Sequence, residues 1–172
     1  MQAELATRNS QNKLRDYVAY PKQAEFHEAG SRFRERLLSA GNQLGKTWSA
    51  GFETAMHLTG RYPDWWQGRV FEKPVAGWVA SETSEVTRDS VQRVLCGRFN
   101  DIGTGAIPKD AIKDKSLKRG VADAIDTIVV RHGGGGDVQA GESLIGFKSY
   151  DQGREKFQAE TLDLVWLDEE PD

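Results

Sequence analysis

The stretch "SAGNQLGKTW", residues 39–48, comes within one residue of a phosphate-binding loop. The full pattern, G-x-x-x-x-G-K-S/T, has its first glycine where this chain has Ala40. A phosphate cradle needs inward-facing backbone N–H groups, little side-chain bulk and a helix N-terminus behind it. Gly41 and Gly45 supply the permissive backbone, and the apolar spacing from Lys46 onward predicts the helix. The alternative is an ordinary glycine-containing turn between a strand and a helix.

The polar side chains of the loop have distinct predicted roles. Lys46 would reach the β- and γ-phosphates of a bound nucleotide, and Thr47 would place its hydroxyl on Mg²⁺. Ala40 is the smallest replacement for glycine, and it is tolerable if its backbone does not need a positive φ. The loop residues predicted to bind the nucleotide are Gly41, Asn42, Gln43, Leu44, Gly45, Lys46 and Thr47.

A second motif, "LVWLDEE" at residues 164–170, places acids directly after an apolar run. A buried strand that ends in aspartate is where a phosphate-loop enzyme holds its Mg²⁺, and an adjacent glutamate can polarise the attacking water. We therefore predict Asp168 as a metal ligand together with Thr47, and Glu169 as the catalytic carboxylate. The alternative is a strand that runs into an acidic surface turn. Together the two motifs predict binding of ATP or GTP with Mg²⁺.

Strand-like and helix-like segments alternate along the chain, which predicts an α/β fold with a mainly parallel central sheet flanked by helices. A strand is expected between the two motifs, and an acid follows the predicted magnesium aspartate. These features favour a P-loop NTPase of the additional-strand, catalytic-glutamate (RecA-like) type. Helices are expected at 21–30, 46–60, 81–97 and 153–160, strands at 35–40, 74–81, 126–132, 143–150 and 164–167, and a surface excursion at 99–124.

Composition limits the remaining possibilities. The chain has 172 residues, 38% hydrophobic and 28% charged, which suits one soluble globular domain. No apolar run approaches the roughly 20 residues that span a bilayer. A lone Cys96 excludes an internal disulfide and is expected in the core, while His27, His57 and His132 are too scattered for a metal site. The net charge of −3 argues against a broad basic nucleic-acid-binding face, although local DNA contacts stay possible.

Five segments together resemble the N-terminal ATPase domain of the large terminase subunit of tailed phages, of the headful-packaging type: "AGNQLGKT", "HLTGRYP", "LCGRF", "SYDQGREKFQAE" and "WLDEEP". In that family the large subunit hydrolyses ATP to drive double-stranded DNA into a preformed capsid, and a separate nuclease domain cuts the DNA. The polar, aperiodic N-terminal segment predicts a flexible leader at 1–19, and the resemblance implies a P-loop ATPase domain at 20–172. It also implies truncation just after the second motif, with the nuclease domain absent.

The resemblance further implies the cofactors, partners and location of the protein. ATP and Mg²⁺ are the expected cofactors. Double-stranded DNA, a terminase small subunit and the portal protein of the procapsid are the expected partners. We expect a homo-oligomeric ring when assembled and a monomer in isolation, in the host bacterial cytoplasm and without a membrane. Two other functions stay open: a helicase or RecA-like DNA-dependent ATPase, and a nucleotide-binding fragment without turnover.

The family pattern can be carried over residue by residue. Lys46 and Thr47 match the loop residues that bind phosphate and Mg²⁺, and Asp168 and Glu169 match the magnesium acid and the catalytic carboxylate. Gln23, in "YPKQAEF", resembles the glutamine that reads adenine upstream of the loop. Its amide could pair with both N6 and N7 of adenine, which would favour ATP over GTP. The alternative for Gln23 is a solvated helix residue.

An arginine is expected to complete the site. Large terminases often have one shortly before the second motif that acts on the nucleotide of a neighbouring subunit, and Arg154 lies 14 residues before Asp168. Its alternative is a surface arginine, and Arg88 and Arg93 are the other candidates for the same role. The family often has a further arginine inside the loop, where this chain has Asn42.

Overall fold

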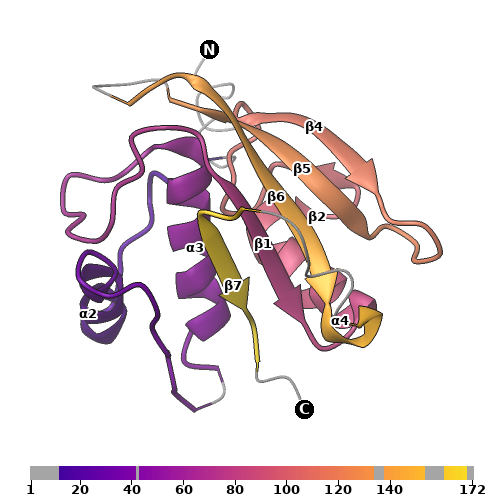
Figure 1. The fold of residues 1–172 in the computed structure, drawn as a ribbon, viewed down its shortest axis with the longest axis horizontal. Helices are drawn as coiled ribbons and strands as arrows, with labels where there is room; N and C mark the ends of the chain where they lie inside the picture. Colours follow the sequence, from indigo (N-terminus) through magenta and orange to yellow (C-terminus); the bar gives the residue numbers. More distant parts are fainter. Residues whose placement is uncertain (1–11, 42, 134–137, 154–160, 170–172) are drawn as a thin grey trace.

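The computed structural model describes residues 12–41, 43–133, 138–153 and 161–169. Its main feature is a five-stranded sheet in the order β4-β5-β6-β1-β7 (Figure 1). β1 pairs in parallel with β6 and β7, whereas β5 pairs antiparallel with both β4 and β6. The strands are β1 (Ala76–Ser81), β4 (Ile112–Leu117), β5 (Ile125–His132), β6 (Gly141–Ser149) and β7 (Leu164–Leu167).

The α/β class is therefore confirmed, but the prediction of a mainly parallel sheet is wrong because the sheet is mixed. Only the residues 133–140 separate β5 from β6. A parallel pair needs a crossover of a dozen or more residues, so this short connection imposes an antiparallel pairing. A second, two-stranded sheet joins β2 (Gly97–Arg98) to β3 (Asp101–Ile102).

The helices that position the site are α2 and α3. α2 spans Pro21–Ala29 with Gly30 at its C-cap, and α3 spans Lys46–Thr59 with Gly60 at its C-cap. Both agree with the predicted helices. Gly60 has φ 67° and donates its N–H to the carbonyl of Met56 at 2.8 Å, which closes the last turn. Phe52 and Met56 of α3 are fully buried, so the apolar face of this helix lies in the core.

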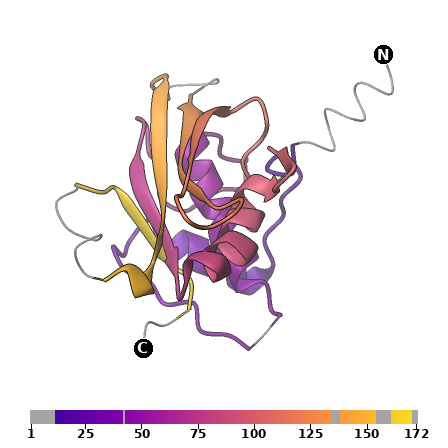
Figure 2. The same cartoon turned by 90° about the vertical axis from the view of Figure 1, so that its right-hand side faces the viewer.

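A helical run over residues 84–96 follows β1, as predicted. It consists of α4 (Ser84–Thr87), the π-helical segment η1 (Arg88–Gln92) and α5 (Arg93–Cys96). The hydroxyl of Thr83 caps its start by accepting a hydrogen bond from the N–H of Val86 at 3.2 Å. The π-helical segment was not predicted, because its i→i+5 bonding leaves no periodicity signal. Among the described residues, α3 and this run lie on the same side of the sheet (Figure 2).

Two predicted segments differ from the structure. Residues 35–40 form no strand, and Leu37 is 89% exposed. Among the described strands, none pairs with the outer edge of β7, and residues 35–40 do not occupy that edge. β7 is accordingly an edge strand, with Trp166 buried but Val165 and Leu167 about half exposed. The expected surface excursion at 99–124 contains β4 and the fully buried Ile107. The helix expected at 153–160 lies, apart from Gly153, outside the described residues.

The N-terminal segment also differs from the flexible leader expected at 1–19. Leu14 and Tyr17 are buried, and the Tyr17 ring stacks on Phe52 with ring centroids 4.4 Å apart. Residues 12–19 thus pack against α3, while residues 1–11 lie outside the described part. Within the described part of the chain, none of the helices has the length and apolar character required to cross a bilayer.

Candidate functional site

The two predicted metal ligands meet in the structure. Thr47 is the second residue of α3, and Asp168 directly follows β7, 121 residues later in the chain. The Thr47 hydroxyl donates to Asp168 Oδ1 at 3.1 Å, with Oδ2 at 3.4 Å. The backbone N–H of Asp168 donates to the carbonyl of Ala80 at 2.8 Å, which anchors the aspartate to the end of β1. Loop and acid therefore form one site.

Ser90 is a member of this site that the sequence did not predict. Its hydroxyl donates to Asp168 Oδ2 at 3.1 Å, opposite the contact made by Thr47. Ser90 belongs to no motif. The only usable signal was its helix, which follows a parallel strand and therefore starts at the sheet edge where Asp168 lies. Which residue of that helix faces the acid depends on the π-helical segment, and the sequence does not reveal this segment.

The environment of Asp168 controls its protonation. The residue is 9% exposed, and burial raises the pKa of its carboxyl group. The hydrogen bonds from Thr47 and Ser90 act in the opposite direction because they stabilise the carboxylate. A bound divalent cation would also stabilise the carboxylate. Burial outweighs the two donors, so the pKa of Asp168 is raised above its usual value.

The loop that precedes α3 bends back toward the helix. The Lys46 ammonium donates to the carbonyl of Ala40. Gln43 and Gly45 have φ of 62° and 77°, in the left-handed region, whereas Ala40 is not among the residues with positive φ. The condition for tolerating a side chain at position 40 is therefore met, since its backbone does not adopt a positive φ. Asn42 lies outside the described residues.

The residues predicted for catalysis are only partly described. Glu169 has an exposed side chain and a backbone φ of 68°, which is uncommon for a residue other than glycine. The Tyr150 hydroxyl donates to the carbonyl of Glu169 at 3.1 Å and supports this turn. Arg154 lies outside the described residues, so its position relative to Glu169 stays a prediction.

Gln23 is buried against the loop rather than solvated. The residue is 6% exposed. Its Oε1 accepts a hydrogen bond from the N–H of Tyr20 at 2.9 Å, and its Nε2 donates to the carbonyl of Gly45 at 3.3 Å. These two contacts define which end of the amide is oxygen and which is nitrogen. The solvated alternative for Gln23 is therefore wrong.

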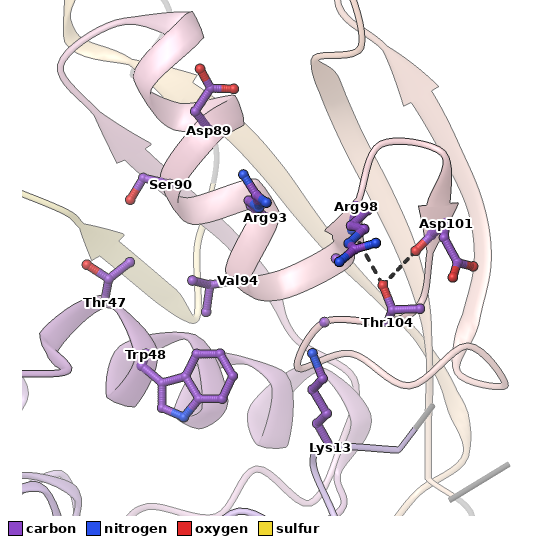
Figure 3. A pocket seen from close by; sticks show the side chains of 12 residues that line it. Lys13, Thr47, Trp48, Asp89, Ser90, Arg93, Val94, Arg98, Asp101 and Thr104 are labelled. Atoms are coloured by element: carbon purple, nitrogen blue, oxygen red, sulfur yellow. Dashed lines mark hydrogen bonds between the residues drawn. The ribbon is translucent and has the colours of Figure 1, made fainter. Parts of the chain in front are cut away.

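A groove of about 640 Å³ opens beside Thr47 (Figure 3). Trp48 and Arg93 line it, and Arg93 lies one helical turn after Ser90. Arg88, the other alternative to Arg154, instead donates to Asp89 at 2.8 Å. Of these two arginines, only Arg93 borders the groove. The other lining residues are Lys13, Thr47, Asp89, Ser90, Val94, Gly97, Arg98, Asp101, Thr104 and Gly105.

Comparison with known proteins identifies the family. The family model for the N-terminal part of T4likevirus-type terminase large subunits matches residues 37–172. The chain therefore belongs to the family of tailed-phage terminase large subunits and represents their N-terminal region.

A relative from Salmonella phage P22, described as the large subunit of terminase, is 39% identical over 173 aligned positions. The alignment covers 92% of this chain but 35% of the relative, so the chain spans about a third of that protein's length. No solved structure was found to match the chain.

Proposed function

We propose that this chain is the ATP-hydrolysing motor domain of a DNA-packaging terminase. The observation that carries the proposal is the contact between Thr47 and Asp168. The Thr47 hydroxyl, directly after Gly45 and Lys46, lies 3.1 Å from Oδ1 of Asp168, directly after β7. The two residues are far apart in the sequence. The same proposal includes the type of α/β fold. We assign it to the P-loop NTPases of the additional-strand, catalytic-glutamate (RecA-like) type.

The donor atoms at this point suit Mg²⁺. Hydroxyl and carboxylate oxygens are hard ligands, and Mg²⁺ is commonly held by one or two such groups together with nucleotide phosphates and water. Thr47 and Asp168 would hold the ion, and Ser90 would orient the aspartate. When bound, the ion would neutralise charge on the phosphate oxygens. Lys46 would turn from the Ala40 carbonyl to the phosphates.

The remaining residues have the roles that the family resemblance implies. Glu169 would polarise the attacking water, since it adjoins Asp168 and its side chain is exposed. Gln23 would read the adenine edge, which makes ATP the preferred nucleotide. Arg154 would act on the nucleotide of a neighbouring subunit, which requires a ring of subunits.

The partners are those of a packaging motor. Double-stranded DNA would be the translocated substrate, and the terminase small subunit and the portal protein of the procapsid would bind the assembled ring in the cytoplasm of the host bacterium. The similarity to the phage P22 large subunit supports these partners over those of a helicase.

The loop assignment is tested by Lys46→Ala. We expect this variant to fold with a nearly unchanged melting temperature but to lose Mg-ATP binding, because Lys46 contacts a carbonyl of the loop and not the core. The assay is titration with a fluorescent ATP analogue, with turnover measured separately. Lys22→Ala is the matched control, since Lys22 is an exposed lysine of α2. Unchanged ATP affinity in a folded Lys46→Ala protein would remove the basis of the proposal.

A further inference from the structure

A buried carboxylate lies on α3, seven residues after Lys46. Glu53 is 5% exposed and has three hydrogen-bonding partners. Arg36 Nη2 donates to Glu53 Oε1 at 2.6 Å, His27 Nδ1 lies 2.7 Å from Oε2, and His57 Nε2 lies 3.3 Å from Oε1. Neither the phosphate loop nor the second motif includes any of these four residues. His27 and His57, which lie far apart in the sequence, therefore meet at one carboxylate.

The partners of Glu53 belong to the segments that surround the phosphate loop. His27 lies on α2, and Arg36 lies between α2 and the loop. Arg36 also donates to the carbonyl of Phe26 at 2.7 Å, so it bonds to α2 and α3 at once. Glu53 therefore joins α2, the segment that leads into the loop, and the helix that follows the loop.

The hydrogen bonds and charges of this cluster hold α2 firmly against α3. A buried carboxylate costs several kcal/mol of desolvation unless other groups compensate for it. Burial by itself would raise the pKa of Glu53, but the hydrogen bonds from His27, His57 and Arg36 outweigh burial and hold the pKa well below its usual value. Because each partner compensates for the burial, α2 cannot move away from α3 without leaving the charge poorly satisfied.

The contact between His27 and Glu53 lies on the same face of α2 as Gln23. Residues four apart lie on the same face of a helix, one turn from each other, so His27 and Gln23 face α3 together. His27 contacts Glu53, and Gln23 contacts the carbonyl of Gly45 at the start of α3. The position of the Gln23 amide at the loop therefore depends on the His27–Glu53 contact one turn away.

We propose that Glu53 is a positioning residue which, through His27, holds the Gln23 amide at the phosphate loop and so determines the preference of the site for adenine over guanine nucleotides. The inference rests on the proposed function, since it requires a nucleotide in the loop. Glu53 touches neither the nucleotide nor the metal; its effect on the base passes entirely through Gln23.

The orientation of the Gln23 amide suits adenine. The Tyr20 N–H occupies one lone pair of Oε1, and the Gly45 carbonyl occupies one N–H of Nε2. One lone pair and one N–H remain. Adenine offers a donor at N6 and an acceptor at N7, which match them, whereas guanine offers acceptors at both O6 and N7. With the amide held in this orientation, guanine would set its O6 against Oε1.

The test is a double-mutant cycle in the 172-residue chain. Dissociation constants for Mg-ATP and Mg-GTP are measured for the parent, Glu53→Gln, Gln23→Leu and the double variant. Loss of one hydrogen bond between a buried side chain and the base weakens nucleotide binding by about tenfold. We expect the parent to prefer ATP by about that factor. Glu53→Gln should lose most of this preference through weaker ATP binding, and the double variant should have the same ratio as Gln23→Leu alone.

The controls separate a positioning role from a purely structural one. Glu28→Gln removes an exposed carboxylate from α2, the helix that carries Gln23 and His27, and should leave the ATP-to-GTP ratio unchanged. If Glu53→Gln does not fold, Arg36→Gln removes one partner and should reduce the ratio by a smaller factor. Equal weakening of ATP and GTP together with a lower melting temperature would overturn the inference, because it would mean that Glu53 only stabilises the fold.

Two further outcomes distinguish this inference from the proposed function. A parent chain that binds Mg-ATP and Mg-GTP equally well overturns the role of Glu53 in base preference but leaves the nucleotide site intact. A folded parent that binds neither nucleotide overturns both. Additive effects of Glu53→Gln and Gln23→Leu on the ratio would also contradict the inference, since the two residues would then act independently.

Discussion

Ser90→Ala provides a sharp test of the predicted metal site. Ser90 donates to Asp168 Oδ2 at 3.1 Å, and Thr47 donates to Oδ1 at the same distance. In the loaded site the Thr47 oxygen would turn to the ion, and Ser90 would still orient the aspartate. Removing its hydroxyl should therefore weaken Mg²⁺ more than it weakens the fold.

The size of the effect follows from these contacts. A hydrogen bond to a charged acceptor contributes about 1.5–3 kcal/mol. The lower end applies because Ser90 is partly exposed, and about 1.4 kcal/mol corresponds to tenfold in affinity. Residues that orient a metal ligand typically change metal affinity by about 10–100-fold. We therefore expect Mg²⁺ to bind about tenfold more weakly in Ser90→Ala.

The variant should also change the dependence on pH. In the proposed site Mg²⁺ would need the carboxylate form of Asp168, so metal binding should be lost as the pH falls through the pKa of this group. Burial raises that pKa and the Ser90 hydrogen bond lowers it. Without Ser90 the pKa should rise further, and Mg²⁺-dependent nucleotide binding should be lost at a higher pH than in the parent.

The assay is nucleotide titration at several Mg²⁺ concentrations and several pH values. Ser84→Ala is the matched control. It deletes the same hydroxyl from the same helical run, but Ser84 Oγ lies 3.0 Å from Ser149 Oγ, away from Asp168. Unchanged Mg²⁺ affinity in Ser90→Ala, or an equal loss in Ser84→Ala, would refute the role of Ser90 at the metal site.

Three other predictions concern catalysis and stability. In a chain that hydrolyses ATP, Glu169→Gln should keep Mg-ATP bound but lose turnover by about 10²–10⁴-fold; parental turnover would exclude Glu169 as the catalytic carboxylate. Mixing Arg154→Ala with Glu169→Gln subunits of an assembling chain should restore part of the activity that each lacks alone, and no recovery in proven mixed rings would exclude action between subunits. Burial lowers the pKa of His57, so the unfolded chain takes up a proton first as the pH falls below about 6.5. The free energy of unfolding, measured with denaturant, should therefore be smaller at pH 5.5 than at pH 7.5, and equal values would contradict this account.

The sequence predicted those parts of the molecule that depend on neighbouring residues. The ends of α3 followed from Lys46 and Gly60, because a left-handed glycine closes a helix by local bonding. The strand that ends in Asp168 followed from a short apolar run bounded by acids. The family followed from the two motifs together with the segments "HLTGRYP", "LCGRF" and "SYDQGREKFQAE".

Tertiary structure alone decided which residues meet. Ser90, which lies in the π-helical segment, meets Asp168 only in the folded chain, and Glu53 meets His27 and Arg36 only once α2 packs beside α3. Strand order likewise determined that β7 is a half-exposed edge of the described sheet. Periodicity and capping act over a few residues, whereas burial and pairing depend on segments far apart in the chain. The sequence therefore predicted the loop and the acid separately, and only the packed sheet brought Thr47 to Asp168.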